Sequence, residues 1–280
     1  MITYTALNDP LAANDTVAQG INNASQIVGW YQASSGAYYG FLYSGGSYTT
    51  LSDPLAVGSA EPLTMALGTN DAGEIVGLYR GADNHIHGFL YKAGTYTTID
   101  DPLGVKTEAY AINKRGQIVG DYNDSNGGIH GFLDSGGKYI TLNDPLGIAG
   151  TVALGINRFG QIVGDYGDSS GHQHGFLYTG GKYITLDDPL GTSTVATGIN
   201  DRGQIVGYYT DGAGDFHGFL YSGGKWITLD DPLAANASTA AHSINNAGQI
   251  VGYYNDVSGG THGFFATVGQ SHAHSDISFI

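Results

Sequence analysis

The chain has 280 residues, enough for one large domain or two small ones, and only 12% of them are charged. Globular proteins ordinarily carry about 25% charged residues, and surface helices need many of them, so an all-helical fold is excluded. The formal net charge of −15 argues against nucleic acid as a partner, and the absence of any long apolar run argues against membrane insertion.

The motif Asp-Pro-Leu first occurs after an opening segment at residues 2–8 and then returns at nearly regular intervals. Its proline occurs at Pro10, Pro54, Pro102, Pro145, Pro189 and Pro232. Ile-Val-Gly and Gly-Phe each recur six times with the same period. A repeat length of about 44 residues indicates six tandem copies of one structural unit.

Each copy contains four short apolar segments, which are clear in the unit at residues 152–187. They cover residues 152–157, 161–166, 173–178 and 182–187, and Gly, Asn, Asp and Ser separate them. Segments of about six residues between turn formers are typical of antiparallel strands. Four such strands in a repeat of this length predict one blade of a β-propeller.

The two ends of the chain indicate how the ring closes. Residues 2–8 form a lone fourth strand, whereas the sixth copy stops after its third strand at Phe265. Unpaired sheet edges are costly, so we expect the opening strand to complete the last blade. The sequence therefore predicts an all-β, six-bladed β-propeller as a single domain over residues 1–270. Its repeats cover about 2–46, 47–94, 95–137, 138–181, 182–224 and 225–270, and a tail follows at 271–280.

Only one connection within the repeat varies in length, namely the segment that leads from a fourth strand into the next first strand. This connection and the turn between the second and third strands should share one face of the disc. Because variable loops on a rigid scaffold often carry function, we expect ligand binding on this face or at the mouth of the central channel.

The run Gly-Ile-Asn-x-x-Gly-Gln-Ile-Val-Gly, followed further along by His-Gly-Phe-Leu, resembles the HAF repeat family of bacterial proteins. The resemblance covers residues 2–266. It implies an extracellular repeat protein, and it names neither a catalytic residue nor a ligand. The chain departs from the family pattern in having Gly where the family name implies Ala after His.

Two aromatic positions are so regular that we interpret them as structural. A histidine precedes Gly-Phe at His87, His130, His174, His217 and His262, with Tyr39 in the first copy. A tyrosine follows Ile-Val-Gly at Tyr31, Tyr79, Tyr122, Tyr166, Tyr209 and Tyr254. We expect the histidine to bond a backbone group and pack against Phe, and the tyrosine to lie opposite the glycine of Gly-Phe.

Two sets of aspartates should crowd the face with the variable connections. One belongs to Asp-Pro and the other opens the turn after the second strand. Asp commonly accepts hydrogen bonds from turn amides, which is our first interpretation. The second is a repeated Ca²⁺ site, although no Asp-x-Asp-x-Asp-Gly loop is present. The candidate metal ligands are Asp101, Asp124, Asp144, Asp168, Asp188, Asp211, Asp231 and Asp256.

The third residue of each first strand differs between the copies, being Gln19, Leu67, Tyr110, Leu154, Thr197 and His242. The first strand of a blade is innermost, so these side chains should line the channel and form one asymmetric pocket. The candidate ligand-binding residues are Gln19, Tyr110, Thr197 and His242, together with Arg80 from the divergent second copy. The candidates for catalysis, assembled across blades, are Glu61, Glu108 and His242.

We predict a protein that binds an extracellular glycan or another hydroxyl-rich small molecule, because abundant Tyr and Asp suit sugar rings and hydroxyls. The alternatives are a polysaccharide lyase or hydrolase with its site at the channel mouth, and a structural adhesion or assembly module. The final residues 276–280 are similar to the ends of type I secretion substrates, which favours export. A cytoplasmic location and the oligomeric state stay open.

Overall fold

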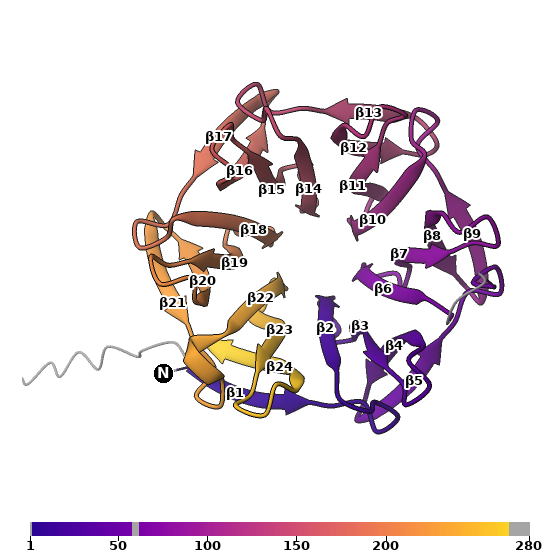
Figure 1. Ribbon diagram of the computed structural model, residues 1–280, viewed down its shortest axis with the longest axis horizontal. Helices are drawn as coiled ribbons and strands as arrows, with labels where there is room; N and C mark the ends of the chain where they lie inside the picture. The colour runs from indigo at the N-terminus through magenta and orange to yellow at the C-terminus, as the bar shows by residue number, and fades with distance from the viewer. Residues whose placement is uncertain (1, 58–61, 269–280) are drawn as a thin grey trace, which may run out of the picture.

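The computed structural model describes residues 2–57 and 62–268 of the chain. Within them, six four-stranded antiparallel sheets are arranged as blades around a central axis, as Figure 1 shows. The predicted six-bladed, all-β propeller is therefore confirmed. The one helical element in the described part is a short 3₁₀ turn, η1 (Ala235–Ala237), and no helix there is long and apolar enough to cross a membrane.

In five blades the strands follow one another outward from the axis in chain order, and in the sixth the outermost strand is the first of the chain. Blade 1 contains β2 (Thr16–Ile21), β3 (Ile27–Gln32), β4 (Tyr38–Ser44) and β5 (Ser47–Leu51). Blade 2 contains β6 (Thr64–Thr69), β7 (Ile75–Arg80), β8 (Ile86–Lys92) and β9 (Thr95–Ile99). Blade 3 contains β10 (Lys106–Ile112), β11 (Gln117–Asn123), β12 (Ile129–Ser135) and β13 (Tyr139–Leu142).

The remaining three blades repeat this plan. Blade 4 contains β14 (Thr151–Ile156), β15 (Ile162–Gly167), β16 (Gln173–Thr179) and β17 (Lys182–Leu186). Blade 5 contains β18 (Ser193–Ile199), β19 (Ile205–Thr210), β20 (Phe216–Ser222) and β21 (Lys225–Leu229). Blade 6 contains β22 (Thr239–Ile244), β23 (Gln249–Asn255), β24 (Thr261–Val268) and β1 (Ile2–Leu7).

The ring closes through β1, the outer strand of blade 6. It pairs antiparallel with β24, from Ile2 opposite Val268 to Leu7 opposite Gly263. Leu7 is buried, so the closing strand contributes to the core as well as to the sheet. The expected completion of the last blade by the opening strand is thus confirmed.

The glycine of each Ile-Val-Gly motif is needed for packing inside the blade. In blade 4, a Cβ atom on Gly164 would lie 1.9 Å from the carbonyl oxygen of Val152 and 2.9 Å from the ring of Phe176. Phe176 is fully buried, as are the equivalent phenylalanines of the other blades. The two recurring motifs are therefore one packing unit, in which a phenylalanine ring covers a glycine in the neighbouring strand.

The register between the second and third strands differs by one residue from our expectation. Tyr166 lies opposite His174, and Gly175 lies opposite Asp165. The tyrosine ring stacks on the histidine ring at 5.2 Å between centroids. The expected tyrosine–glycine pairing was wrong because the five-residue turn at 168–172 sets the register, as turn length does in hairpins.

The recurring histidine is held by Asp side chains, or by one Asp and one Asn, rather than by the backbone group that we expected. Nδ1 of His174 lies 3.1 Å from Asp187, and Nε2 lies 3.4 Å from Asp168. Burial alone would lower the pKa of His174, but these two carboxylates outweigh it and raise the pKa. Because both ring nitrogens are engaged, the histidine has a structural role, although its partners are not those predicted.

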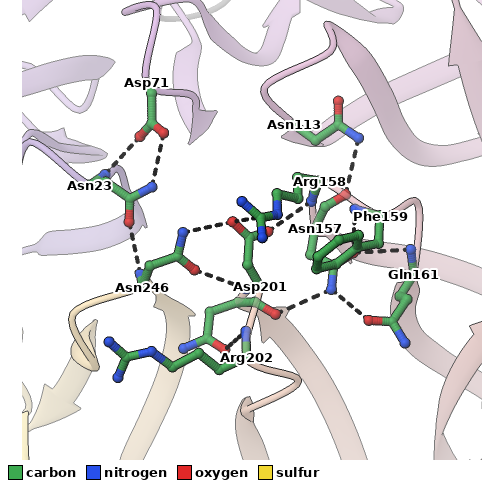
Figure 2. A network of polar contacts seen from close by, with 11 residues as sticks. Asn23, Asp71, Asn113, Asn157, Arg158, Phe159, Gln161, Asp201, Arg202 and Asn246 are labelled. Atoms are coloured by element: carbon green, nitrogen blue, oxygen red, sulfur yellow. Dashed lines mark hydrogen bonds and ion pairs between the residues drawn. The ribbon is translucent and has the colours of Figure 1, made fainter.

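Six asparagines at the ends of the inner strands form a closed hydrogen-bonded ring around the axis, which we call the asparagine ring. Each Nδ2 group donates to the main-chain carbonyl of its counterpart in the next blade, at 3.0–3.2 Å. The members are Asn22, Asn70, Asn113, Asn157, Asn200 and Asn245. Figure 2 shows the step from Asn113 to Asn157. The ring joins all six blades at one end of the channel.

Candidate functional site: the axial channel

A β-bulge occurs at the third residue from the end of every inner strand. In β2, Ala18 pairs with Gly29 and Gly20 pairs with Val28, so Gln19 has no partner in the ladder. The other inner strands have the same irregularity. A bulge redirects a side chain out of the regular sheet pattern. The bulged residues are Gln19, Leu67, Tyr110, Leu154, Thr197 and His242, and all six line one axial cavity.

The axial cavity has a volume of about 300 Å³. It extends from the bulged residues to the turns between the first and second strands, where the asparagine ring surrounds it. Small-molecule sites begin at about this size. The cavity therefore reaches the face opposite the variable connections on which we expected binding. Length variation in a loop reports tolerance to insertion and does not locate a cavity.

Three side chains in the cavity have polar atoms without a protein partner among the described residues. Nδ1 of His242 is hydrogen-bonded to Oε1 of Gln19, which leaves the other side-chain nitrogen of each residue available. Burial lowers the pKa of His242 to about 4, so the ring is neutral at pH 7. The hydroxyl of Tyr208 is the third such group. These groups can donate to and accept from hydroxyls.

The other two polar residues among the bulged positions already form hydrogen bonds within the protein. The hydroxyl of Thr197 lies 2.8 Å from the carbonyl oxygen of Ala241, and Tyr110 donates to Glu108 at 2.6 Å. Both residues therefore shape the cavity through packing and position, and their hydroxyls are less available than the amide nitrogen of Gln19 and the hydroxyl of Tyr208.

On the other side of the bulged residues, the channel has an aromatic wall. Trp30, Tyr208 and Tyr253 line a second cavity there, together with His242, whose ring lies edge-on to Tyr253 at 5.3 Å. Blades 1, 5 and 6 supply these side chains. Aromatic faces beside hydrogen-bonding groups suit a ligand with both C–H and O–H surfaces.

Blades 3 and 4 contain carboxyl groups within their sheets that line neither cavity, and of these Asp121 and Asp165 are buried. Glu108 and Asp121 lie opposite each other across β10 and β11, and Lys106 contacts Glu108 at 3.1 Å. Burial, and next the charge of Glu108, raise the pKa of Asp121. In blade 4, burial raises the pKa of Asp165 to about 7.

The remaining candidates from the sequence lie apart from the axial cavity. Arg80 ends β7 and lines neither cavity, although its backbone N–H donates to Leu63. Glu108 belongs to blade 3 and His242 to blade 6, and no contact joins them. Glu61 lies outside the described residues. The tail at 271–280 lies outside them too, so the secretion motif has no structural description.

The candidate calcium ligands serve as turn acceptors. Oδ1 of Asp144 accepts from the N–H of Leu146 at 2.9 Å, and Oδ1 of Asp124 accepts from Asn126 and Gly128 at 2.8 Å. The equivalent residues Asp101, Asp188 and Asp231, and Asp168, Asp211 and Asp256, make the same turn contacts. Among residues 2–57 and 62–268, no three His, Asp or Glu side chains converge as a metal site. Calcium binding stays a prediction.

Sequence reasoning missed a second ring at the mouth of the axial cavity, which we call the rim. It consists of the residue after each asparagine of the ring, namely Asn23, Asp71, Lys114, Arg158, Asp201 and Asn246, and all six line the cavity. The position varies from copy to copy within a turn that begins with Asn in all six copies and ends with Gly in five, Ser25 being the exception. That variation is the same signal that singled out the bulged residues.

The fold and the channel together define a six-bladed β-propeller with an asymmetric axial cavity. No protein-family model matches the chain and no curated protein does, so the HAF repeat resemblance stays a prediction.

Solved structures match the fold. A lectin from Aleuria aurantia in complex with Fucα1-6GlcNAc is 16% identical with a TM-score of 0.57, over 94% of this chain and 97% of that one. A mutant of AofleA from Arthrobotrys oligospora is also 16% identical with a TM-score of 0.57, over 94% and 86% of the two chains. A sialidase from Trypanosoma rangeli is 9% identical with a TM-score of 0.52, over 90% of this chain and 54% of that one. At these identities the likeness concerns the fold alone.

Proposed function

We propose that this protein binds a carbohydrate in the axial channel, in an extracellular setting. The observation that carries the proposal is the axial cavity of about 300 Å³, whose six bulged residues differ in chemistry although the backbone around them repeats. A cavity of identical side chains would suit only a six-fold symmetric ligand. Side chains of five kinds, with leucine alone occurring twice, suit a single small molecule without symmetry.

The chemistry of the channel supports a hydroxyl-rich ligand. Unpartnered groups on Gln19, His242 and Tyr208 offer both donors and acceptors, and Trp30 and Tyr253 add aromatic surface beyond them. Sugars present hydroxyls at their edges and C–H groups on their faces, so both kinds of surface have a counterpart here. The similar Aleuria aurantia protein is a lectin that was solved with Fucα1-6GlcNAc, which is consistent with this proposal.

Isothermal titration calorimetry against a panel of neutral mono- and disaccharides, chosen after a glycan array, tests the proposal. The variant Gln19→Ala should weaken binding of the best ligand by about tenfold, as expected for losing one or two hydrogen bonds. The matched control is Asn126→Ala, which removes an amide from an exposed turn on the opposite face. Equal loss in both variants, or no sugar bound by the wild type, would refute the proposal.

A further inference from the structure

The two faces of the disc carry opposite charge. Eight of the ten Lys and Arg residues lie in or beside the turns that surround the axial cavity and the turns between third and fourth strands. They are Lys92, Lys114, Arg115, Lys138, Arg158, Lys182, Arg202 and Lys225. Described acidic residues on that face are Asp71, Glu74, Asp134 and Asp201, so the face is net positive.

The opposite face carries sixteen aspartates in its connections and turns, against Arg80 and Lys106 at the strand ends. They are Asp9, Asp15, Asp53, Asp83, Asp100, Asp101, Asp124, Asp144, Asp168, Asp187, Asp188, Asp211, Asp215, Asp230, Asp231 and Asp256. A protein with a net charge of −15 therefore presents its positive face at the mouth of the axial cavity. Such a field favours the approach of an anion to that mouth.

The rim shows how oxygen atoms bind at this mouth. In four blades the backbone N–H of a rim residue donates to the side-chain oxygen of the next rim residue. For example, Asn23 donates to Oδ1 of Asp71 at 2.9 Å, and Arg158 donates to Oδ1 of Asp201 at 3.0 Å. Figure 2 shows this chain of contacts running from Arg158 through Asp201 and Asn246 to Asn23 and Asp71.

The chain of contacts is interrupted in one sector. The residue after Asp71 in the rim is Lys114, and the residue after Lys114 is Arg158, neither of which has a side-chain acceptor. The backbone N–H groups of Asp71 and Lys114 consequently have no acceptor among the described residues, and the Lys114 ammonium has no ion-pair partner there. We call this sector the rim gap.

We propose that the rim gap binds a carboxylate or another oxyanion carried by the ligand of the axial cavity, so that the ligand is an acidic sugar. The sugar part of this inference rests on the proposed function, whereas the anion site follows from the contacts of the rim residues alone. The two free N–H groups would hold the anion as their counterparts hold the oxygens of Asp71 and Asp201 in the other sectors. Lys114 supplies the opposite charge, and charge-assisted bonds are the stronger ones.

The groups that face the rim gap are compatible with an anion. The carboxylate of Asp71 is directed to the other side, where both of its oxygens accept from Asn23 at 2.9 Å. Arg158 lies over the ring of Phe159 and contacts Asp201 at 3.6 Å, so its charge is only partly offset. Arg115, the neighbour of Lys114, is exposed and adds a further positive charge.

Two measurements test the inference. Amide NMR spectra recorded with sulfate alone should show saturable shifts of the Asp71 and Lys114 N–H signals. Calorimetry should show that a hexuronate binds about tenfold more tightly than the neutral hexose of the same stereochemistry, with the difference falling as salt is added.

The variant Lys114→Asn should abolish both effects without unfolding the protein, because an asparagine supplies the acceptor that the N–H of Asp71 lacks. The control Lys225→Asn removes the same charge from the same face, outside the rim, and should keep both effects. If sulfate causes no shift of these N–H signals and the uronate and the hexose bind with equal affinity, the anion site is overturned and sugar binding is left intact. Sulfate shifts without binding of any sugar would reject the proposed function and keep the anion site.

Discussion

Asp165 in β15 offers a direct test of how a buried carboxyl group affects stability. The residue is 6% exposed, and its carboxyl group accepts one hydrogen bond from Gln173 at 3.1 Å. Burial raises its pKa to about 7. The variant Asp165→Asn keeps the shape of the side chain and the oxygen acceptor for Gln173 but cannot ionise. The difference in unfolding free energy between the variant and the wild type, measured as a function of pH, therefore isolates the contribution of this one group.

The magnitude follows from the pKa difference between the folded and unfolded states. An aspartate in an unfolded chain has a pKa of about 3.9, and three units of difference correspond to about 4 kcal/mol. Because the folded-state pKa is raised, the associated stability is complete below about pH 4 and is lost as the pH rises to about 7. The stability advantage of Asp165→Asn over the wild type should therefore grow by about 3 kcal/mol between pH 5 and pH 8.

Urea denaturation at pH 5 and pH 8, followed by tryptophan fluorescence, measures this advantage. The control is Glu74→Gln in blade 2, where hydrogen bonds from Lys92 and Asn70 lower the pKa of the carboxyl group. That group is ionised in both states at either pH, so its effect on unfolding should not change between them. An advantage of Asp165→Asn that is the same at pH 5 and pH 8 would refute the reasoning.

Four other predictions concern stability. Deleting residues 1–8 removes the outer strand of blade 6, so the cooperative thermal transition should disappear; an unchanged melting curve would contradict closure by β1. Asn157→Ala strands two turn amides and a carbonyl, and should lower the unfolding free energy by about 3 kcal/mol in urea titrations, against under about 0.5 kcal/mol for Asn126→Ala. Because the pKa of His242 is lowered in the folded protein, its contribution to stability is present above about pH 6.5 and is lost towards pH 4, by about 3 kcal/mol. His242→Gln should remove that loss. Equal acid sensitivity of the variant and the wild type would contradict this contribution. If the aspartate turns bind Ca²⁺, EDTA should lower the melting temperature by several degrees, whereas an unchanged value removes calcium from the description.

The fold could be predicted from the sequence because the repeat encodes it at short range. Ile-Val-Gly and Gly-Phe specify neighbouring strands of one blade, and the period between copies specifies the number of blades. The lone segment at residues 2–8 then has only one unpaired edge available to it. Each of these inferences depends on residues within one copy or at the ends of the chain.

The site was only partly predictable, because its contacts join residues in different copies. Copy-to-copy variation located Gln19 and His242, but their mutual hydrogen bond spans most of the chain. Within one copy, the asparagine at the end of the first strand is typical of a turn. Nothing within that copy shows that Asn113 bonds Asn157 in the next blade. The rim gap depends on two consecutive blades both lacking an acceptor, which becomes visible only when Lys114 and Arg158 are seen as neighbours.

The closed asparagine ring holds the backbone of the six rim residues at equivalent positions around the axis. Chemistry at this mouth can therefore be relocated by point substitution, with the scaffold unchanged. Exchanging the side chains of Lys114 and Asn246, which stand half a turn apart, should carry the unpaired positive charge to the far side of the opening. Substitutions in single blades would then change which orientation of a charged ligand the opening selects.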